Sequence, residues 1–124
     1  MKNTFNDFRS RLDPAFSADT ASPGYPSWVT LSAGHCAAVA VLVARRLGCQ
    51  IVSARVCGVS HWFNRLDHDG RAFDIDLTGD QFGLDRVQIA NAGDLYPETR
   101  VRKLSEVTAE TLARSRLLES RMKP

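Results

Sequence analysis

The sequence predicts an α+β fold, in which a small antiparallel sheet of three to five strands carries helices largely on one side. Three observations support this prediction. An alanine-rich segment ends at Gly48, three short segments with strand-like patterns follow it, and helical patterns lie near both ends of the chain. A chain of 124 residues, 44% of them hydrophobic, has the size of one compact domain, which we expect to span residues 1–124.

The first element is an amphipathic helix over residues 4–17. Phe5, Phe8, Leu12 and Phe16 recur at intervals of three or four residues, although Pro14 can end the helix early. Residues 17–32 combine prolines, a glycine and serines without a helical or strand period, which indicates a long ordered loop. Loops of this length are often functional.

The second element is a central, largely buried helix. Residues 32–36, Ser-Ala-Gly-His-Cys, lead into the helix formers of residues 37–47, and Gly48 provides a stop signal. The helix should therefore begin near Cys36.

Strands follow at residues 50–56, 61–66 and 71–78, and residues 67–70 between the last two give a strong hairpin signal. Residues 79–100 are irregular, with one short strand expected over residues 87–90.

The last element is a helix that begins near Ser105 or Thr108 and ends near Met122. Leu112, Leu117 or Leu118, and Met122 should face the core.

The charge balance argues against two classes of partner. Sixteen basic and fourteen acidic residues give a net charge of +2, too small to indicate binding to nucleic acid or to a membrane surface. Basic residues near the C-terminus alternate with acidic ones, which indicates a solvated helix face: Arg100, Arg102, Lys103, Arg114 and Arg116. No segment has the length and apolarity of a signal peptide or a membrane span, so a cytoplasmic location is expected.

Cys49 and Cys57 lie at the two ends of one predicted strand, roughly 25 Å apart at about 3.3 Å per residue, and cannot form a disulfide with each other. We expect both to be reduced, buried thiols.

Cys36, His61 and Asp76 form the main candidate site. A cysteine at a helix N-terminus is activated by the free N–H groups there, and a nearby imidazole can exchange its proton. If residues 67–70 form a four-residue loop, His61 pairs directly with Asp76. If Asp69-Gly70 form a two-residue turn, Asp76 lies opposite Phe63 and is the diagonal neighbour of His61 on the same face.

Each of these residues also has a purely structural interpretation. A cysteine early in an alanine-rich helix is most often simply buried, a strand histidine is often a satisfied core residue, and Asp76 can cap a turn. A zinc site is disfavoured, because His35 and Cys36 are adjacent and no Cys-x-x-Cys or His-Glu-x-x-His pattern occurs. No metal or other cofactor is expected.

Three stretches of the sequence resemble the YunG-like family of small bacterial and phage proteins: residues 16–23, residues 34–40, and residues 61–66 together with 74–82. The resemblance implies that the family pattern covers nearly the whole chain. Glutamine commonly precedes the cysteine in that pattern, whereas this chain has His35. Either side chain can donate a hydrogen bond to an oxyanion.

The chain is also distantly similar to the transglutaminase-like branch of papain-like enzymes. The similarity lies in a cysteine at a helix start, a histidine on a strand, and an Asp-x-Thr sequence fifteen residues later, here Asp76-Leu77-Thr78. It implies a papain-like layout and again points to Asp76.

These observations together favour a cysteine hydrolase or acyltransferase that acts on an amide, isopeptide or thioester bond of a peptide, protein or small acyl substrate. Cys36 would be the nucleophile, His61 the proton carrier and Asp76 the residue that orients His61. Further residues are candidates for the oxyanion site or for substrate contacts: His35, Asp19, Thr20, Asn64 and Trp28. The alternatives are a catalytically idle interaction or regulatory module of bacterial or phage origin and, third, a zinc-binding protein.

Overall fold

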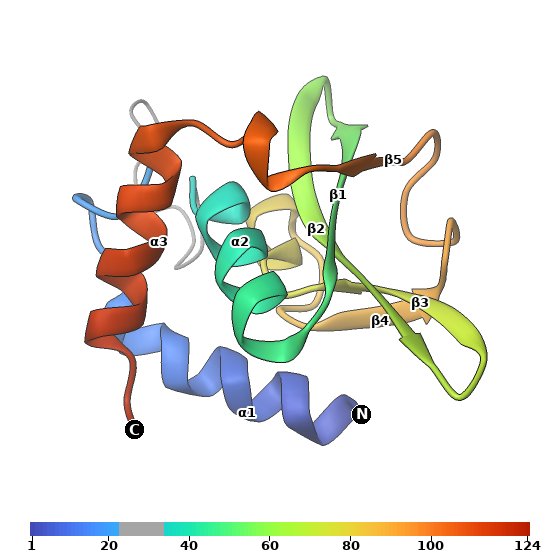
Figure 1. The fold of residues 1–124 in the computed structure, drawn as a ribbon, viewed down its shortest axis with the longest axis horizontal. Coiled ribbons are helices and arrows are strands. Elements are labelled where there is room, and N and C mark those ends of the chain that lie inside the picture. The colour runs from blue at the N-terminus through green and yellow to red at the C-terminus, as the bar shows by residue number, and fades with distance from the viewer. Residues whose placement is uncertain (23–33) are drawn as a thin grey trace.

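The computed structural model describes residues 1–22 and 34–124 (Figure 1). The α-helices in this part of the chain are α1 (Lys2–Leu12), α2 (Cys36–Leu47) and α3 (Ala109–Arg121). The strands are β1 (Gln50–Val56), β2 (Val59–His68), β3 (Arg71–Asp76), β4 (Gln88–Asn91) and β5 (Arg100–Arg102). They form one five-stranded sheet in the order β4-β3-β2-β1-β5, and every neighbouring pair is antiparallel.

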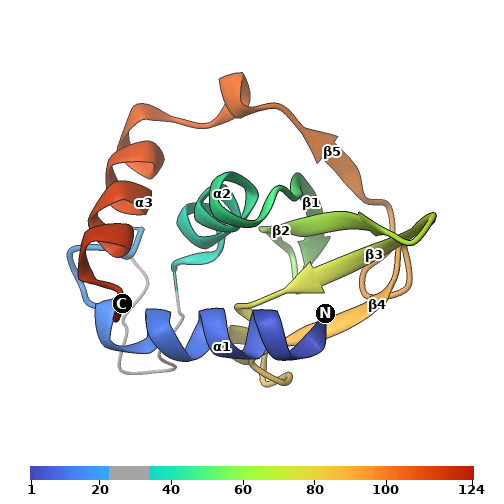
Figure 2. The same cartoon turned by 60° about the horizontal axis from the view of Figure 1, so that its bottom comes forward.

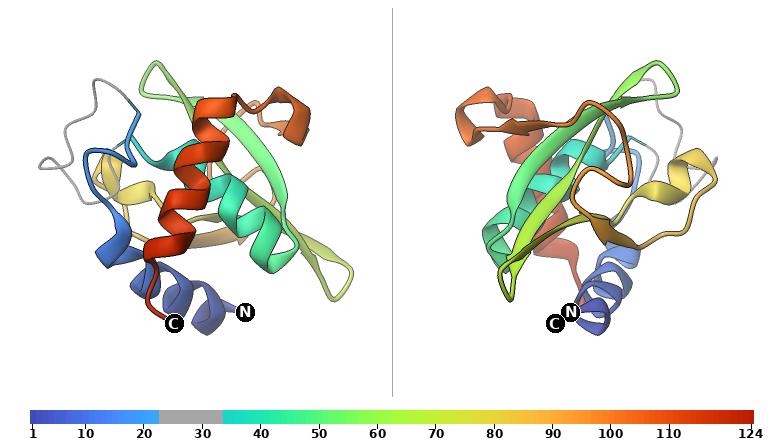
Figure 3. Two further views of the ribbon diagram at one scale, coloured as in Figure 1. Left: turned by 60° about the vertical axis from the view of Figure 1, so that its left-hand side comes forward. Right: turned by 90° about the vertical axis from the view of Figure 1, so that its right-hand side faces the viewer.

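The helices pack together beside the sheet, which confirms the predicted α+β class. Figure 2 shows α2 between α1, α3 and the strands, and in the left view of Figure 3 α3 packs across α2. The main core joins all three helices to β3. Its buried members include Phe5, Phe8, Leu12, Val39, Leu42, Val43, Ile75, Leu77 and Leu118.

The first helix is shorter than the prediction of residues 4–17. It ends at Leu12 and is followed by a single 3-10 turn, Asp13–Ala15, that contains Pro14. Proline has no N–H to continue the helical hydrogen bonds, so the chain tightens and leaves the helix there.

The predicted central helix is confirmed. Cys36 is its first residue, His35 is its N-cap, and Gly48 ends it in the left-handed conformation with φ of 70°. The six consecutive residues 38–43 are buried.

Two tight turns set the strand register. Asp69 and Gly70 have φ of 52° and 77°, and Cys57 and Gly58 have φ of 52° and 79°. Positive φ at both central residues is the type I′ geometry that suits a two-residue hairpin. His68 therefore pairs with Arg71, and the four-residue loop, with His61 directly opposite Asp76, is wrong.

The two-residue alternative is confirmed. Asn64 pairs with Ile75, and one further step in the same register sets Phe63 opposite Asp76. The tighter turn also explains why β2 extends beyond the predicted residues 61–66.

The prediction that Cys57 is buried is wrong, because it lies exposed in the β1–β2 turn, whereas Cys49 is buried as expected. Burial raises the pKa of the Cys49 thiol to about 11.

The strand predicted to end at residue 78 ends at Asp76, because Thr78 begins a 3-10 turn, Gly79–Phe82. The short strand expected at residues 87–90 occurs as β4, shifted by one residue. The edge strand β5 was not predicted, since it has only three residues.

The final helix begins after Thr108, whose hydroxyl accepts a hydrogen bond from the Thr111 N–H. No helix of the described residues is long and apolar enough to cross a membrane.

Candidate active site

His61 and Asp76 are joined by a buried hydrogen bond. The Nε2–H of His61 donates to Oδ2 of Asp76 at 2.8 Å, and both side chains are fully shielded from solvent. The residues come from adjacent strands, and the diagonal register puts them on one face of the sheet. A carboxylate at Nε2 fixes the ring orientation and leaves Nδ1 for another partner.

Cys36 acts on the same ring. Its side chain is among the groups that raise the pKa of His61, and its position at the first residue of α2 brings helix and strand together. Cys36 is partly exposed, whereas His61 and Asp76 are not. Cys36 is therefore the residue of the three that a molecule from solvent can approach most easily.

The electrostatics of the site favour a charged imidazole. Burial opposes protonation of His61, but its hydrogen bonds and charge interactions with Asp76 and Cys36 outweigh that effect and raise its pKa to about 9. A ring with this pKa carries its proton at neutral pH.

Asp76 is held by more than His61. Its Oδ1 accepts hydrogen bonds from the Thr78 N–H at 2.9 Å and the Thr78 hydroxyl at 3.3 Å. The hydroxyl of Tyr96 donates to Oδ2, the same oxygen that binds His61. Burial and the charge of Asp76 raise the pKa of Tyr96 well above its usual range, so the phenol remains a donor.

Aromatic rings enclose the imidazole of His61. Phe63 stacks on it with ring centroids 5.9 Å apart, and the rings of Phe82 and Tyr96 meet it edge-on at 4.8 and 5.3 Å. These contacts exclude water from the ring and restrict its rotation.

Two residues of this site were missed by the sequence interpretation. Tyr96 lies in the irregular segment between β4 and β5, where no periodic pattern marks it. Gln81 places Nε2 at 3.5 Å from Nδ1 of His61 and donates to the Thr78 carbonyl at 3.1 Å. It lies inside residues 74–82, one of the stretches that resemble the YunG-like pattern, so that stretch was the available signal.

A buried ion pair anchors the segment that carries Tyr96. Arg65 binds Asp74 through two hydrogen bonds of 2.6 and 3.1 Å, and it also donates to the Thr99 hydroxyl. Asp74 in turn accepts from the Gly93 N–H at 2.8 Å. Thr99 and Gly93 lie on either side of Tyr96, so this pair fixes both ends of its loop.

A buried cation, Arg9, anchors the turn that carries Gln81. Arg9 of α1 is 1% exposed and donates to both carboxylate oxygens of Asp80 and to the Leu77 carbonyl. Gly79 in this turn has no room for a side chain, because an added Cβ would lie 2.8 Å from the Asp85 carbonyl oxygen. Helix α1 thus positions the turn next to His61.

The structure links two of the other candidate residues to each other. His35, at the N-cap of α2, is fully buried, and its Nε2 lies 2.6 Å from the Thr20 hydroxyl. The His35 ring also packs against Phe16, with centroids 4.6 Å apart. These contacts join the N-terminal segment to the residue before Cys36.

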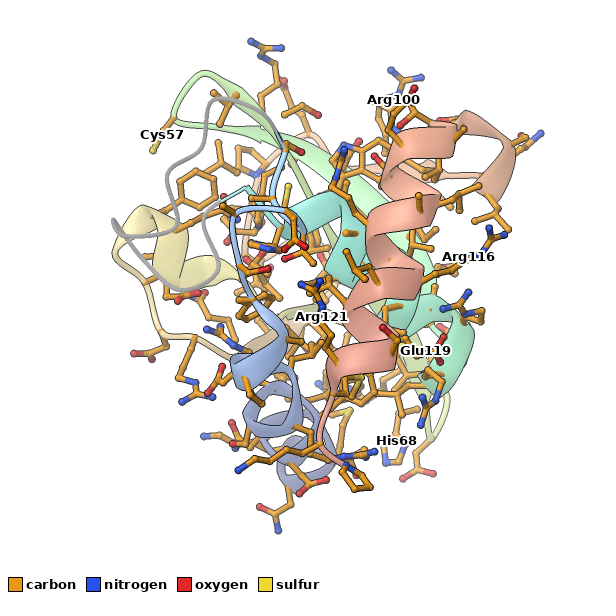
Figure 4. The ribbon with its side chains drawn as sticks, turned by 90° about the vertical axis from the view of Figure 1, so that its left-hand side faces the viewer. Cys57, His68, Arg100, Arg116, Glu119 and Arg121 are labelled. Carbon is orange, nitrogen blue, oxygen red and sulfur yellow. The ribbon has the colours of Figure 1, made fainter. Side chains whose placement is uncertain are left out.

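The remaining candidates have different surroundings. Asp19 is exposed and pairs at 2.7 Å with Arg121, which lies on α3 (Figure 4). This hydrogen bond holds the pKa of Asp19 well below the usual range. Asn64 faces α2, where its amide donates to the Ala40 carbonyl at 2.8 Å, so it lies on the opposite sheet face from His61. Trp28 lies outside the described residues.

Within residues 1–22 and 34–124, no group of three or more His, Cys, Asp or Glu side chains is arranged to hold a metal ion.

The family model described as YunG protein matches residues 4–123, which is nearly the whole chain and includes Cys36, His61 and Asp76. No curated protein and no solved structure matches the chain. The extent of the family match shows that this chain belongs to the YunG family.

Proposed function

We propose that this protein is a cysteine hydrolase or acyltransferase with a papain-like, transglutaminase-like arrangement, acting on an amide, isopeptide or thioester bond. The observation that carries the proposal is the grouping of Cys36, His61 and Asp76. His61 is hydrogen-bonded to Asp76, the Cys36 side chain helps to raise the pKa of His61, and of the three residues only Cys36 is partly exposed. A nucleophile, a base and a group that orients the base are the three parts such a site requires.

In the reactive pair the thiol proton of Cys36 resides on the His61 ring, and acylation begins with attack of the Cys36 thiolate on the carbonyl carbon of the substrate. A carbon–sulfur bond forms, and the carbonyl oxygen becomes an oxyanion. The Cys36 N–H can donate to this oxygen, because the first N–H groups of a helix have no partner inside the helix. The protonated His61 ring then gives its proton to the leaving amine or thiol as the bond to that group breaks.

Deacylation reverses the role of His61. The ring takes a proton from water, or from an acceptor amine, as that molecule attacks the acyl-enzyme carbonyl. The carbon–sulfur bond breaks, the acid or the new amide leaves, and the sulfur and the charged ring are restored. Asp76 holds Nε2 and so keeps the orientation of the His61 ring fixed through both steps.

Formation of an acyl-enzyme tests this proposal. The protein is treated with 4-nitrophenyl acetate, and the acetylated residues are located by mass spectrometry. We expect rapid acetylation of Cys36 followed by slow turnover, with both lost in Cys36→Ala and strongly reduced in His61→Gln. Exposed Cys57 is the internal control. If Cys36 is acetylated no faster than Cys57 in the folded wild-type protein, the proposal is wrong and a catalytically idle interaction module becomes the better interpretation.

A further inference from the structure

A second candidate binding site lies along the C-terminal half of α2. A groove of about 490 Å³ is bordered by α2, α3, β1 and β5, and none of Cys36, His61 and Asp76 lines it. We call it the α2–β5 groove. Its floor contains Val41 and Ile51, which are 3% and 5% exposed, and its rim contains Val101 and Leu104, which are 51% and 58% exposed.

Val101 and Leu104 are the two most exposed large apolar side chains of the described residues. Val101 lies on the edge strand β5 and Leu104 in the following 3-10 turn, and Figure 2 shows this part of the chain crossing from the sheet to α3. Two half-exposed apolar side chains beside an apolar floor form a continuous surface, which in a soluble domain commonly marks a binding site.

The charged side chains that line the groove are all basic: Arg45, Arg102 and Arg116. Arg102 is paired with Glu106 at 3.0 Å, so Arg45 and Arg116 are the cations to consider. Glu119 compensates Arg45 only in part, because its carboxylate is shared with Arg46 at 2.7 and 2.9 Å. Arg116 has no ion pair among the described residues, and Figure 4 shows it on the same side of α3 as Glu119.

We infer that the α2–β5 groove binds a single-chain anionic amphiphile, that is, an acyl chain with a carboxylate head. The acyl chain would cover the apolar floor and rim, and the carboxylate would pair with Arg116 and with the incompletely compensated Arg45. The volume of the groove falls in the range of roughly 300–1,000 Å³ found for small-molecule sites, which favours one small ligand over a protein partner.

The test uses three ligands with the same twelve-carbon chain and different heads: dodecanoate, dodecanol and dodecylammonium. Each is titrated below its critical micelle concentration into the full-length protein in a calorimeter. Dodecanoate should bind saturably at one site, and dodecylammonium at least about tenfold more weakly, because its charge repels the arginines. Equal affinities for the anionic and cationic ligands would overturn the inference.

Two variants locate the site. Arg116→Glu and Leu104→Asp should each weaken dodecanoate binding at least about fivefold by removing the charge or the apolar contact. Arg71→Glu, an exposed arginine at the start of β3, is the matched control and should leave binding unchanged. Unchanged binding in Arg116→Glu, absence of saturable dodecanoate binding, or binding only to anionic phospholipid vesicles would each contradict the inference.

Discussion

His61 and Tyr96 donate hydrogen bonds to the same oxygen of Asp76, although they come from a strand and from a loop 35 positions apart in the sequence. The shared oxygen couples the two donors. The phenol of Tyr96 neutralises part of the charge of the Asp76 carboxylate. The carboxylate therefore stabilises the protonated imidazole less, and Tyr96 should lower the pKa of His61 through Asp76.

Replacing Tyr96 by phenylalanine should therefore raise the pKa of His61 further and destabilise the fold. The lost hydrogen bond is buried and ends on a carboxylate, so we expect the free energy of unfolding to fall by about 2 kcal/mol. An NMR titration of the ring and chemical denaturation measure the two effects. Unchanged values of both would mean that the hydroxyl of Tyr96 plays no part in the site.

Asp76→Asn should have the opposite effect on the ring. The charge and hydrogen bond of Asp76 are major reasons that the pKa of His61 reaches about 9, while burial acts against protonation. With a neutral amide at position 76, burial dominates, and the pKa should fall to or below its ordinary value of 6.5. The same NMR titration measures this shift, and exposed His68 is an internal reference. A ring that still titrates near 9 in this variant contradicts the electrostatic account.

The stability of the protein should depend on pH through His61. Its pKa is about 9 in the folded protein against 6.5 in the unfolded chain, so the folded state binds the proton more tightly. The resulting stabilisation is complete below pH 6.5 and is lost as the pH rises toward 9. It amounts to as much as about 3 kcal/mol.

Urea denaturation at a series of pH values measures this loss, and His61→Gln should remove most of it. His68→Gln, a change in the exposed hairpin, should not. A wild-type stability that is flat or rises between pH 6.5 and 9 would contradict the raised pKa.

Arg65→Gln should loosen the loop that carries Tyr96. The variant leaves Asp74 fully buried with only the Gly93 N–H as a partner, and an uncompensated buried charge costs about 3 kcal/mol. Hydrogen exchange should increase in residues 92–99 before it increases in β1 and β2. Arg71→Gln, which removes an exposed hydrogen bond to Asn91, is the comparison. Equal effects of the two substitutions would show that the buried ion pair does not anchor the loop.

The sequence was most informative where the signals are local. The helix that begins at Cys36 and ends at Gly48 follows from helix formers and a glycine stop, and both bounds are correct. The sequence allowed two registers of the strands that carry His61 and Asp76. The two registers differ by two residues, so both place these side chains on the same face of the sheet. The positive φ angles of Asp69 and Gly70 decide between them, and those angles depend on the twist of the strands as well as on the two residues.

Other parts of the site depend on long-range contacts. Tyr96 reaches Asp76 because Arg65 and Asp74 hold its loop over the sheet, and no pattern around Tyr96 encodes that contact. The position of Asp19 also depends on a long-range contact. Its partner Arg121 lies about a hundred residues away in the sequence, so no local pattern around Asp19 predicts the pair.

The rate of alkylation of Cys36 by iodoacetamide at pH 6 tests the central claim most directly. In the same molecule, Cys57 is exposed in the turn between β1 and β2 and serves as the comparison thiol. The account predicts that Cys36 is alkylated at least about tenfold faster than Cys57, and that His61→Gln removes this advantage while the protein remains folded. Cys36 alkylation that is no faster than that of Cys57, or that is unaffected by His61→Gln, would contradict a catalytic pairing of Cys36 with His61.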